Sequence, residues 1–345
     1  MNYDYEFHSA FNDTYDIQVR KIIRFLSEDA RISVSDLSKK VGVSRVTAIK
    51  KLKHVEKTFD IRYTLELNEA KLGIDNPHLV MIKFGKKPDY DKIAEILAKS
   101  YVPQVAVATK GDYDMIIYAV TPISREYANW DKAMQIALSK YGATWQSSWA
   151  VHKQLGYFPV RNELIDQLAI KEKYKNLLKV LNENSRATFQ EISKKLGIHF
   201  NTVAYTFEKM IKSGYIERAT ISMAPPKGIV FMSFFSKYSP REGYEESSAL
   251  ARKAFLNDDR FSLVSRYLVC APLVGSYDFF TLGAFDSYDS ALKHDINYHK
   301  SVLEKHKVEV KFAYLDKVIL GRLPIRSIDA QNEYKLIRWR ADFTK

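Results

Sequence analysis

The stretch Gly42 to Val55, GVSRVTAIKKLKHV, decides the fold of the first part of the chain, because it predicts a short helix after a tight turn. Its glycine supplies the turn, and Ser44 stands where a helix N-cap belongs. Apolar residues recur at helical spacing and form one buried stripe, made of Ala48, Leu52, Val55 and Phe59. Two apolar helices are predicted before it, around Ile17 to Leu26 and Leu37 to Val41. Together they predict a helix-turn-helix (HTH).

The side of this helix opposite the stripe is strongly basic. Between Ser44 and Thr58 there are five lysines or arginines and one glutamate. Lysines on such a face neutralise DNA phosphates, while short side chains near the helix N-terminus meet base edges. A basic face that only meets solvent is the alternative. The residues predicted to contact DNA are Ser44, Arg45, Val46, Thr47, Lys50, Lys51, Lys53, His54 and Lys57, with Arg62 just beyond the helix.

The chain repeats this pattern once, which indicates a duplicated two-domain unit. An insertion in the second copy is predicted near Tyr238 to Tyr244. Single positions match as well, Arg31 with Arg186 for example. The matching segments are Ser33 to Ser44 with Thr188 to His199, GDYD (Gly111 to Asp114) with GSYD (Gly275 to Asp278), and LGYFPVR (Leu155 to Arg161) with LGRLPIR (Leu320 to Arg326).

The second copy of the recognition helix, within Gly197 to Met210, GIHFNTVAYTFEKM, keeps the apolar stripe and loses most of the charge. Glu208 stands at the position of Lys53, where a carboxylate would repel phosphate. We expect this helix to bind DNA more weakly or with altered specificity. The alternative is that it does not contact DNA and only holds its domain together. The residues predicted to contact DNA are Asn201, Thr202, Tyr205, Lys209 and Lys212.

After each HTH the sequence predicts an α/β part. Arg62 to Asn68, RYTLELN, alternates like a strand and is expected to form a wing. The order strand, helix, strand, strand, helix, strand then follows, which is the ferredoxin-like βαββαβ pattern. The fold class is α+β. The expected ranges are 16–75 for the first winged HTH, 76–152 for the first ferredoxin-like domain, 153–170 for a linker, 171–228 and 229–318 for the second pair of domains, and 319–345 for a tail.

Composition favours a nucleic-acid partner. The 345 residues include 53 Lys and Arg against 41 Asp and Glu, a net charge of +12. A single cysteine, Cys270, cannot form an intrachain disulfide, so a reducing cytoplasm is expected. We find no apolar run long enough for a membrane span and no metal-ligand spacing. The expected protein binds duplex DNA and uses neither a cofactor, a metal nor a membrane.

The segment DIQVRKIIRFLSEDARISVSDLSKKVGVS, the KLG of Lys71 to Gly73 and the GDYD hairpin resemble the Lrp/AsnC (feast/famine) family of transcription regulators. The resemblance covers most of residues 16–151 and, more loosely, 171–315. It implies that each ferredoxin-like domain is a RAM domain, that the two RAM sheets pair, and that the chain is a dimer fused into one polypeptide. It also implies homo-oligomers formed through RAM domains, and a small effector such as an amino acid.

The resemblance places candidate effector residues in the two hairpins, at Gly111, Asp112, Asp114, Gly275 and Asp278. Turn formation explains Gly111 and Asp112 equally well without a ligand. The family pattern does not account for the charge loss in the second HTH or for the tail after Arg326.

Two other functions stay open. Sirohaem decarboxylases also resemble Lrp proteins and occur as paired or fused units, but the basic residues that such chemistry needs reduce here to Arg266, His294 and His299. Because no nucleophile–base pair or phosphate-binding loop is found, no enzyme activity and no catalytic residues are predicted. The third reading is an architectural protein that binds DNA by charge with little sequence choice.

Overall fold

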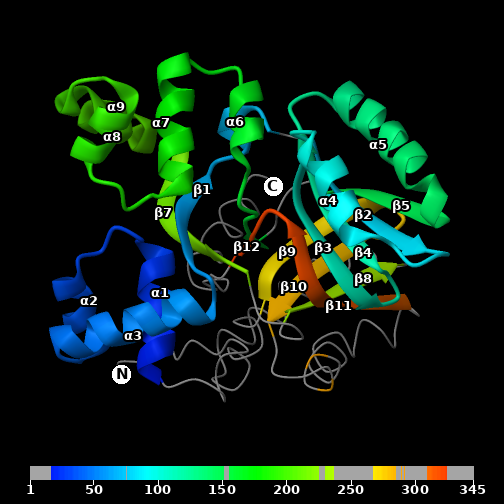
Figure 1. The fold of residues 1–345 in the computed structure, drawn as a ribbon, viewed down its shortest axis with the longest axis horizontal. Coiled ribbons are helices and arrows are strands. Elements are labelled where there is room, and N and C mark those ends of the chain that lie inside the picture. Colours follow the sequence, from blue (N-terminus) through cyan, green and yellow to red (C-terminus); the bar gives the residue numbers. More distant parts are fainter. Residues whose placement is uncertain are drawn as a thin grey trace, which may run out of the picture.

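The computed structural model describes residues 17–74, 76–150, 155–224, 230–236, 267–284, 289, 291 and 309–324 (Figure 1). The first half consists of α1 (Ile17–Glu28), α2 (Val34–Val41), α3 (Arg45–Thr58), β1 (Arg62–Leu67), the 3₁₀ turn η1 (Ala70–Leu72), β2 (Asn76–Phe84), α4 (Tyr90–Ala98), β3 (Pro103–Gly111), β4 (Met115–Thr121), α5 (Ser124–Leu138), η2 (Ser139–Tyr141) and β5 (Ala143–Ala150). The second half consists of β6 (Leu155–Gly156), α6 (Asn162–Gln167), α7 (Glu172–Glu183), α8 (Phe189–Leu196), α9 (Phe200–Lys212), β7 (Ile216–Met223), β8 (Val230–Ser236), β9 (Tyr267–Gly275), β10 (Phe279–Ala284), β11 (Glu309–Leu320) and β12 (Leu323–Pro324).

Several predicted features lie outside the described residues. They are the insertion near Tyr238 to Tyr244, the tail from Arg326 onward, and Arg266, His294 and His299. Within the described part of the chain, no helix combines the length and apolar character that a membrane span requires.

The first HTH, α1 to α3, forms as predicted. The hydroxyl oxygen of Ser44 accepts a hydrogen bond from the N–H of Thr47 and so caps α3. Gly42 turns the chain between α2 and α3 with a φ of 78°, a left-handed conformation that glycine adopts without strain. The predicted stripe of Ala48, Leu52, Val55 and Phe59 is buried. Burial of this stripe against α1 and α2 fixes which side of α3 faces solvent.

The second HTH, α7 to α9, keeps the same design with different caps. Thr188 and Glu191 form a reciprocal capping box at the start of α8. Gly197 provides the turn with a φ of 65°, and His199 Nδ1 accepts the N–H of Asn201 at the start of α9. The stripe on α9 is buried at Val203 and Met210 and partly buried at Phe207. Loss of charge on α9 has therefore left the domain's packing intact.

The two halves are joined by a small sheet with the order β1-β7-β12. β1 pairs antiparallel with β7, its counterpart in the second half, with Arg62 opposite Ser222. The first helix of each HTH packs on the strand of the other half, α7 on β1 and α1 on β7. The predicted strand is thus confirmed. Residues Thr64 to Leu67 are all buried, because β1 lies between α7 and the rest of the core.

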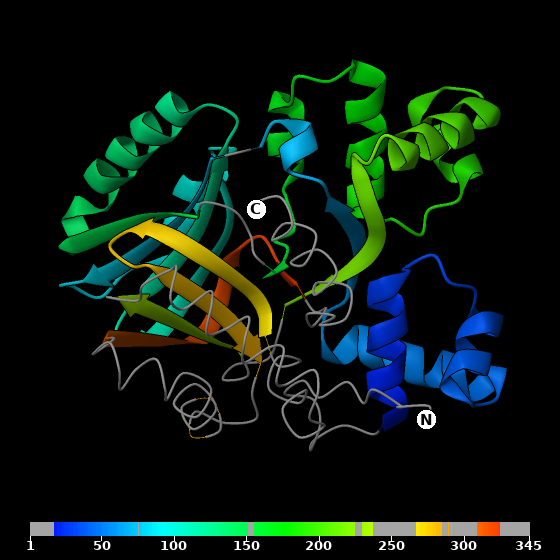
Figure 2. The ribbon, with the colours of Figure 1, turned by 180° about the vertical axis from the view of Figure 1, so that it is seen from behind.

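The larger sheet contains strands from both halves. Within the first half the order is β5-β2-β4-β3, and within the second it is β11-β8-β10-β9. β11 pairs with β3 and β5 pairs with β9, so these eight strands close into a barrel. Figure 2 shows the strands of the second half, yellow-green to orange, on this side, and the blue-green strands of the first half behind them.

Successive residues of β2 point alternately to the two faces of the sheet, and so they belong to two different apolar clusters. Leu79 and Met81 belong to the core that includes the barrel interior. Val80 and Ile82 belong to a separate cluster that they form with residues of α4 and α5, such as Ile93. These two helices therefore cover the outside of the first-half sheet, away from the HTH domains (Figure 1).

The ends of some segments differ from the expected domain ranges. β11 continues to Leu320, beyond the predicted end of the second ferredoxin-like domain. β12 lies in the predicted tail and pairs with β7. The predicted linker, residues 153–170, contains β6 and the helix α6. Local apolar periodicity did not reveal these short elements, because pairing with distant strands holds β6 and β12 in place.

Candidate nucleic-acid interface

The N-terminal end of α3 is built for close approach to a ligand. The Ser44 hydroxyl accepts the Thr47 N–H at 3.1 Å and forms a second hydrogen bond with the Thr47 hydroxyl at 2.9 Å. This cap leaves the Val46 side chain, 76% exposed, as the outermost apolar group of the first turn. An exposed valine here has no packing role within the domain, so it is free to contact a partner.

The basic residues of α3 face solvent. Arg45, Lys50, Lys53, His54 and Lys57 are exposed, while Thr47 and Lys51 are half-buried. Among the residues that the structure describes, no ion pair neutralises Arg45, Lys50, Lys53 or Lys57. Their charge is thus available for an external anion, and phosphate groups spaced along a duplex fit a row of this kind.

The equivalent face of α9 is different in character. Asn201, Thr202, Tyr205, Lys209 and Lys212 are exposed, as their predicted role requires, and Glu208 is exposed among them. Sequence reasoning did not identify the exposed apolar residues that adjoin them. Ile198 is 37% exposed and Phe200, the counterpart of Arg45, is 45% exposed. The alignment of the two copies could have identified Phe200, because it stands at the position of the positively charged Arg45.

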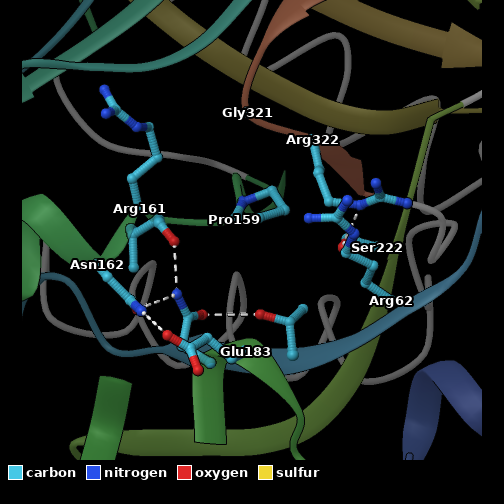
Figure 3. Close-up of a pocket in the computed structure, with 11 residues that line it drawn as sticks. Arg62, Pro159, Arg161, Asn162, Glu183, Ser222, Gly321 and Arg322 are labelled. Atoms are coloured by element: carbon cyan, nitrogen blue, oxygen red, sulfur yellow. Dashed lines mark hydrogen bonds between the residues drawn. The ribbon is translucent and has the colours of Figure 1, made fainter. Parts of the chain in front are cut away.

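Arg62, also predicted to contact DNA, lines a pocket of about 460 Å³ between the β1-β7-β12 sheet, residues 159–162 and the end of α7. Figure 3 shows it beside Ser222 and Arg322, with Asn162 and Glu183 across the pocket. Arg62 therefore does not lie in the row of basic residues on α3. Sequence reasoning missed this pocket, although it had matched the two segments LGYFPVR and LGRLPIR that supply Pro159 and Arg322 to it.

The hairpin residues proposed for an effector make contacts within the chain. Asp114 Oδ2 accepts the N–H of Phe84 at 2.8 Å, and Asp112 Oδ2 accepts the N–H of Phe312 at 2.8 Å. Gly111 has a φ of 119°, and a Cβ there would lie 2.5 Å from the Phe312 carbonyl oxygen. Gly275 has a φ of 138°, and a Cβ there would lie 2.8 Å from the Ser147 carbonyl oxygen. The N–H of Asp278 donates to the Phe235 carbonyl oxygen.

The tyrosines of the two hairpins meet inside the barrel. The hydroxyl groups of Tyr113 and Tyr277 hydrogen-bond to each other, and the Tyr113 hydroxyl also donates to Gln146 Oε1 at 2.6 Å. Burial raises the pKa of both tyrosines, so both hydroxyls stay protonated. Within the described residues, no group of His, Cys, Asp and Glu is arranged to hold a metal ion.

Comparison with known proteins gives independent information on both HTH regions. An AsnC-type helix-turn-helix domain matches residues 20–54, and a winged helix-turn-helix DNA-binding domain matches residues 173–217. The chain is 27% identical to HTH-type transcriptional regulator FL11 of Pyrococcus furiosus over 143 residues, 41% of this chain and 94% of that protein. It is 33% identical to an uncharacterized HTH-type transcriptional regulator of the same organism over 102 residues, 29% of this chain and 68% of that protein.

Among solved structures, the fold of nearly the whole chain is similar to that of siroheme decarboxylase NirDL. The alignment covers 95% of this chain and 100% of that chain, with a TM-score of 0.54 and 12% sequence identity. At this level of identity the likeness concerns the fold alone.

Proposed function

Because the chain belongs to the Lrp/AsnC family of HTH-type transcriptional regulators, we propose that it regulates transcription by binding duplex DNA through α3. The observation that supports this proposal is the exposed row of Arg45, Lys50, Lys53 and Lys57, which no ion pair neutralises in the described part of the chain. In this mode Val46 and Thr47 contact base edges, and Ser44, Lys51 and His54 add backbone contacts.

We propose an altered role for α9. Asn201 offers an amide suited to adenine, and Thr202, Tyr205, Lys209 and Lys212 are exposed beside it. Glu208 reduces the attraction to phosphate, so the two halves bind DNA unequally. A two-fold symmetric regulator reads a palindrome, whereas this chain would prefer one strong half-site and one weak one.

The test is fluorescence anisotropy with duplex DNA across a series of salt concentrations. Lys50→Gln/Lys53→Gln should weaken binding and lower the slope of log affinity against log salt by about two. Lys86→Gln/Lys87→Gln removes the same charge from exposed barrel residues and should leave the slope unchanged. If the wild type and both variants give the same salt slope, α3 does not contact DNA.

The DNA preference separates a regulator from an architectural binder. Selection from a random duplex library should yield one defined half-site with a weaker partner at a fixed spacing. An architectural binder would return no motif, and its affinity for competitor DNA would equal its affinity for the selected sequence.

The remaining architecture is part of the proposal. The orders β5-β2-β4-β3 and β11-β8-β10-β9 support two RAM domains of ferredoxin-like topology, and their joined edges support a pseudo-dimer within one chain. We propose that further copies associate through the RAM domains and that a small effector acts there. Since the hairpin carboxylates already bind backbone amides, thermal unfolding with each amino acid tests whether a ligand competes for them.

The fold likeness to siroheme decarboxylase NirDL favours one alternative, an enzyme that acts on a tetrapyrrole. The basic residues expected for that chemistry, Arg266, His294 and His299, lie outside the described residues. Titration with an iron uroporphyrin distinguishes the two functions. A saturable absorbance change at stoichiometric ligand would support the enzyme, and its absence together with specific DNA binding would support the regulator.

A further inference from the structure

The pocket that contains Arg62 lies where five segments of the chain meet. Its walls come from β1, the segment before α6, the end of α7, β7 and the turn between β11 and β12. Residues of both halves of the chain therefore contribute to it. The volume of about 460 Å³ is within the range of small-molecule sites, about 300 to 1,000 Å³.

Two guanidinium groups lie on one side of this pocket (Figure 3). The Arg322 side chain is 13% exposed; its Nη1 binds Asp60 Oδ2 at 2.8 Å, and its Nε donates to the Ser222 hydroxyl at 3.2 Å. The remaining nitrogen, Nη2, is buried and has no hydrogen-bond partner among the described residues. Burial lowers the pKa of Arg322, the hydrogen bond and charge of Asp60 raise it, and the positive charge of Arg62, which lies beside it in Figure 3, lowers it.

Within the described residues, the positive charge on this side is not fully balanced. Asp60 pairs with Arg322, whereas Arg62 is exposed and forms no ion pair with any described residue. Arg161, which also lines the pocket, turns its guanidinium away to the carbonyl oxygens of Ser100 and Pro103, both at 2.9 Å. One net positive charge and one buried unpaired donor remain, and an oxyanion would satisfy both.

The opposite wall is polar and internally hydrogen-bonded. Thr64 Oγ1 donates to Asn182 Oδ1 at 2.7 Å, and Asn182 Nδ2 donates to Asn162 Oδ1 at 3.0 Å. Asn162 Nδ2 then donates to Glu183 Oε1 at 2.9 Å. Each amide oxygen keeps a free lone pair direction for a ligand donor. Because these side chains hold one another, the wall is preorganised and binding needs little further ordering.

The duplication provides an internal comparison. In the alignment of the two copies, Glu217 stands where the first half has Arg62, and Tyr157 stands where the second half has Arg322. Both counterparts are engaged within the chain, since Glu217 Oε1 accepts from Asn68 at 2.5 Å and the Tyr157 hydroxyl donates to the Ile221 carbonyl oxygen at 2.7 Å. The arginine pair is therefore present at one of the two equivalent positions only. If the fold itself required two arginines there, both positions would have them.

We propose that this pocket binds a small molecule bearing a carboxylate or phosphate group, with the oxyanion held between the guanidinium groups of Arg62 and Arg322. The ligand links β1, the strand that follows α3 and carries Arg62, to α7, which carries Asn182. Occupancy then adjusts how the two HTH domains are placed. Binding itself does not depend on the proposed DNA function, and only this consequence does.

The test uses the full chain, with inorganic phosphate and succinate as probes in isothermal titration calorimetry at constant ionic strength. At least one probe should bind the wild type above a sodium chloride control. Arg62→Gln should weaken that binding at least about ten-fold, because it removes a charged hydrogen-bond donor. Since Arg62 is exposed and makes no ion pair with described residues, this variant should keep its fold, which circular dichroism checks.

Two control variants separate the pocket from the DNA-binding face. Arg45→Gln and Lys50→Gln/Lys53→Gln should bind the probe like the wild type, and the second should bind DNA more weakly. Preference for phosphate would indicate a phosphorylated ligand, and preference for succinate a carboxylate; either supports the site. The proposal is overturned if neither probe binds, if Arg62→Gln binds as tightly as the wild type, or if the α3 variants abolish binding.

Discussion

Arg31 and Arg186 occupy equivalent positions in the two halves, and each donates a hydrogen bond to the loop of the other half. Arg31 Nη1 donates to the Ser185 carbonyl oxygen at 2.5 Å, and Arg186 Nη2 donates to the Ile32 carbonyl oxygen at 3.2 Å. Burial lowers the pKa of Arg31, and the neighbouring charge of Arg186 acts in the same direction. The pair thus joins the two HTH domains at the pseudo-two-fold axis, next to the β1–β7 pairing.

Removal of either arginine should destabilise the protein. We expect Arg31→Ala and Arg186→Ala each to lower the free energy of unfolding by about 1.5 to 3 kcal/mol, since each leaves a carbonyl group without its charged donor. Urea denaturation followed by circular dichroism measures this. Arg45→Ala removes an exposed arginine and should change stability by less than about 0.5 kcal/mol. A loss at Arg31 or Arg186 no greater than this control would contradict a joining role.

Reversal of charge on α9 should strengthen DNA binding. Glu208→Lys restores the charge that the first half has at Lys53, so affinity should rise and the salt slope should increase by about one. Glu95→Lys on α4 changes the net charge equally at another exposed position and serves as the control. If both variants bind DNA alike, α9 does not contact DNA and only supports its domain.

The hairpin glycine should tolerate no side chain. At Gly111 an added Cβ would lie 2.5 Å from the Phe312 carbonyl oxygen, and the φ of 119° already disfavours an L-residue. Gly42 has a φ of 78° with open space around it. Gly42→Ala should therefore lower the free energy of unfolding by the backbone strain alone, about 1 to 2 kcal/mol. We expect Gly111→Ala to lose at least about 1 kcal/mol more in urea denaturation. Equal losses would show that β11 shifts to make room.

Stability should fall in mild acid because of His78. Burial lowers the pKa of His78 from 6.5 to about 4, and its ring stacks on Tyr127 with centroids 3.4 Å apart. Between these pH values the unfolded chain binds a proton that the folded chain does not, so stability is lost as pH falls from 6.5 towards 4. His78→Phe keeps the stacking and removes the proton uptake. Its free energy of unfolding should therefore change less between pH 7 and pH 5 than that of the wild type.

The exposed histidine on α3 provides the comparison for this experiment. His54 faces solvent, so His54→Phe controls for the histidine-to-phenylalanine substitution itself. A His78→Phe protein with the full wild-type pH dependence would assign the acid sensitivity to other groups.

Local sequence predicted the elements that local interactions form. The α3 stripe, the Ser44 cap and the Gly42 turn depend on residues within a few positions of one another, and all three are present. The exposed charges of α3 followed from the same periodicity, because a helix with one buried side must present the other.

Long-range pairing could not be predicted in the same way. Strand propensity indicated β1 but contained nothing about its pairing with β7 or its contact with α7. Arg62 and Arg322 come together only because β1 and β12 flank β7 in one sheet. Their juxtaposition has no local signature, although the matched segment that contains Arg322 marked the region.

The pairing of β1 with β7 joins two parts of one polypeptide, so its formation does not depend on protein concentration. Between separate chains the same contact would weaken on dilution by mass action. The paired HTH domains therefore persist at a very low copy number, and translation of one message always supplies them in equal amounts. A mutation in α3 or α9 is inherited without its counterpart in the other half, so the two helices change independently.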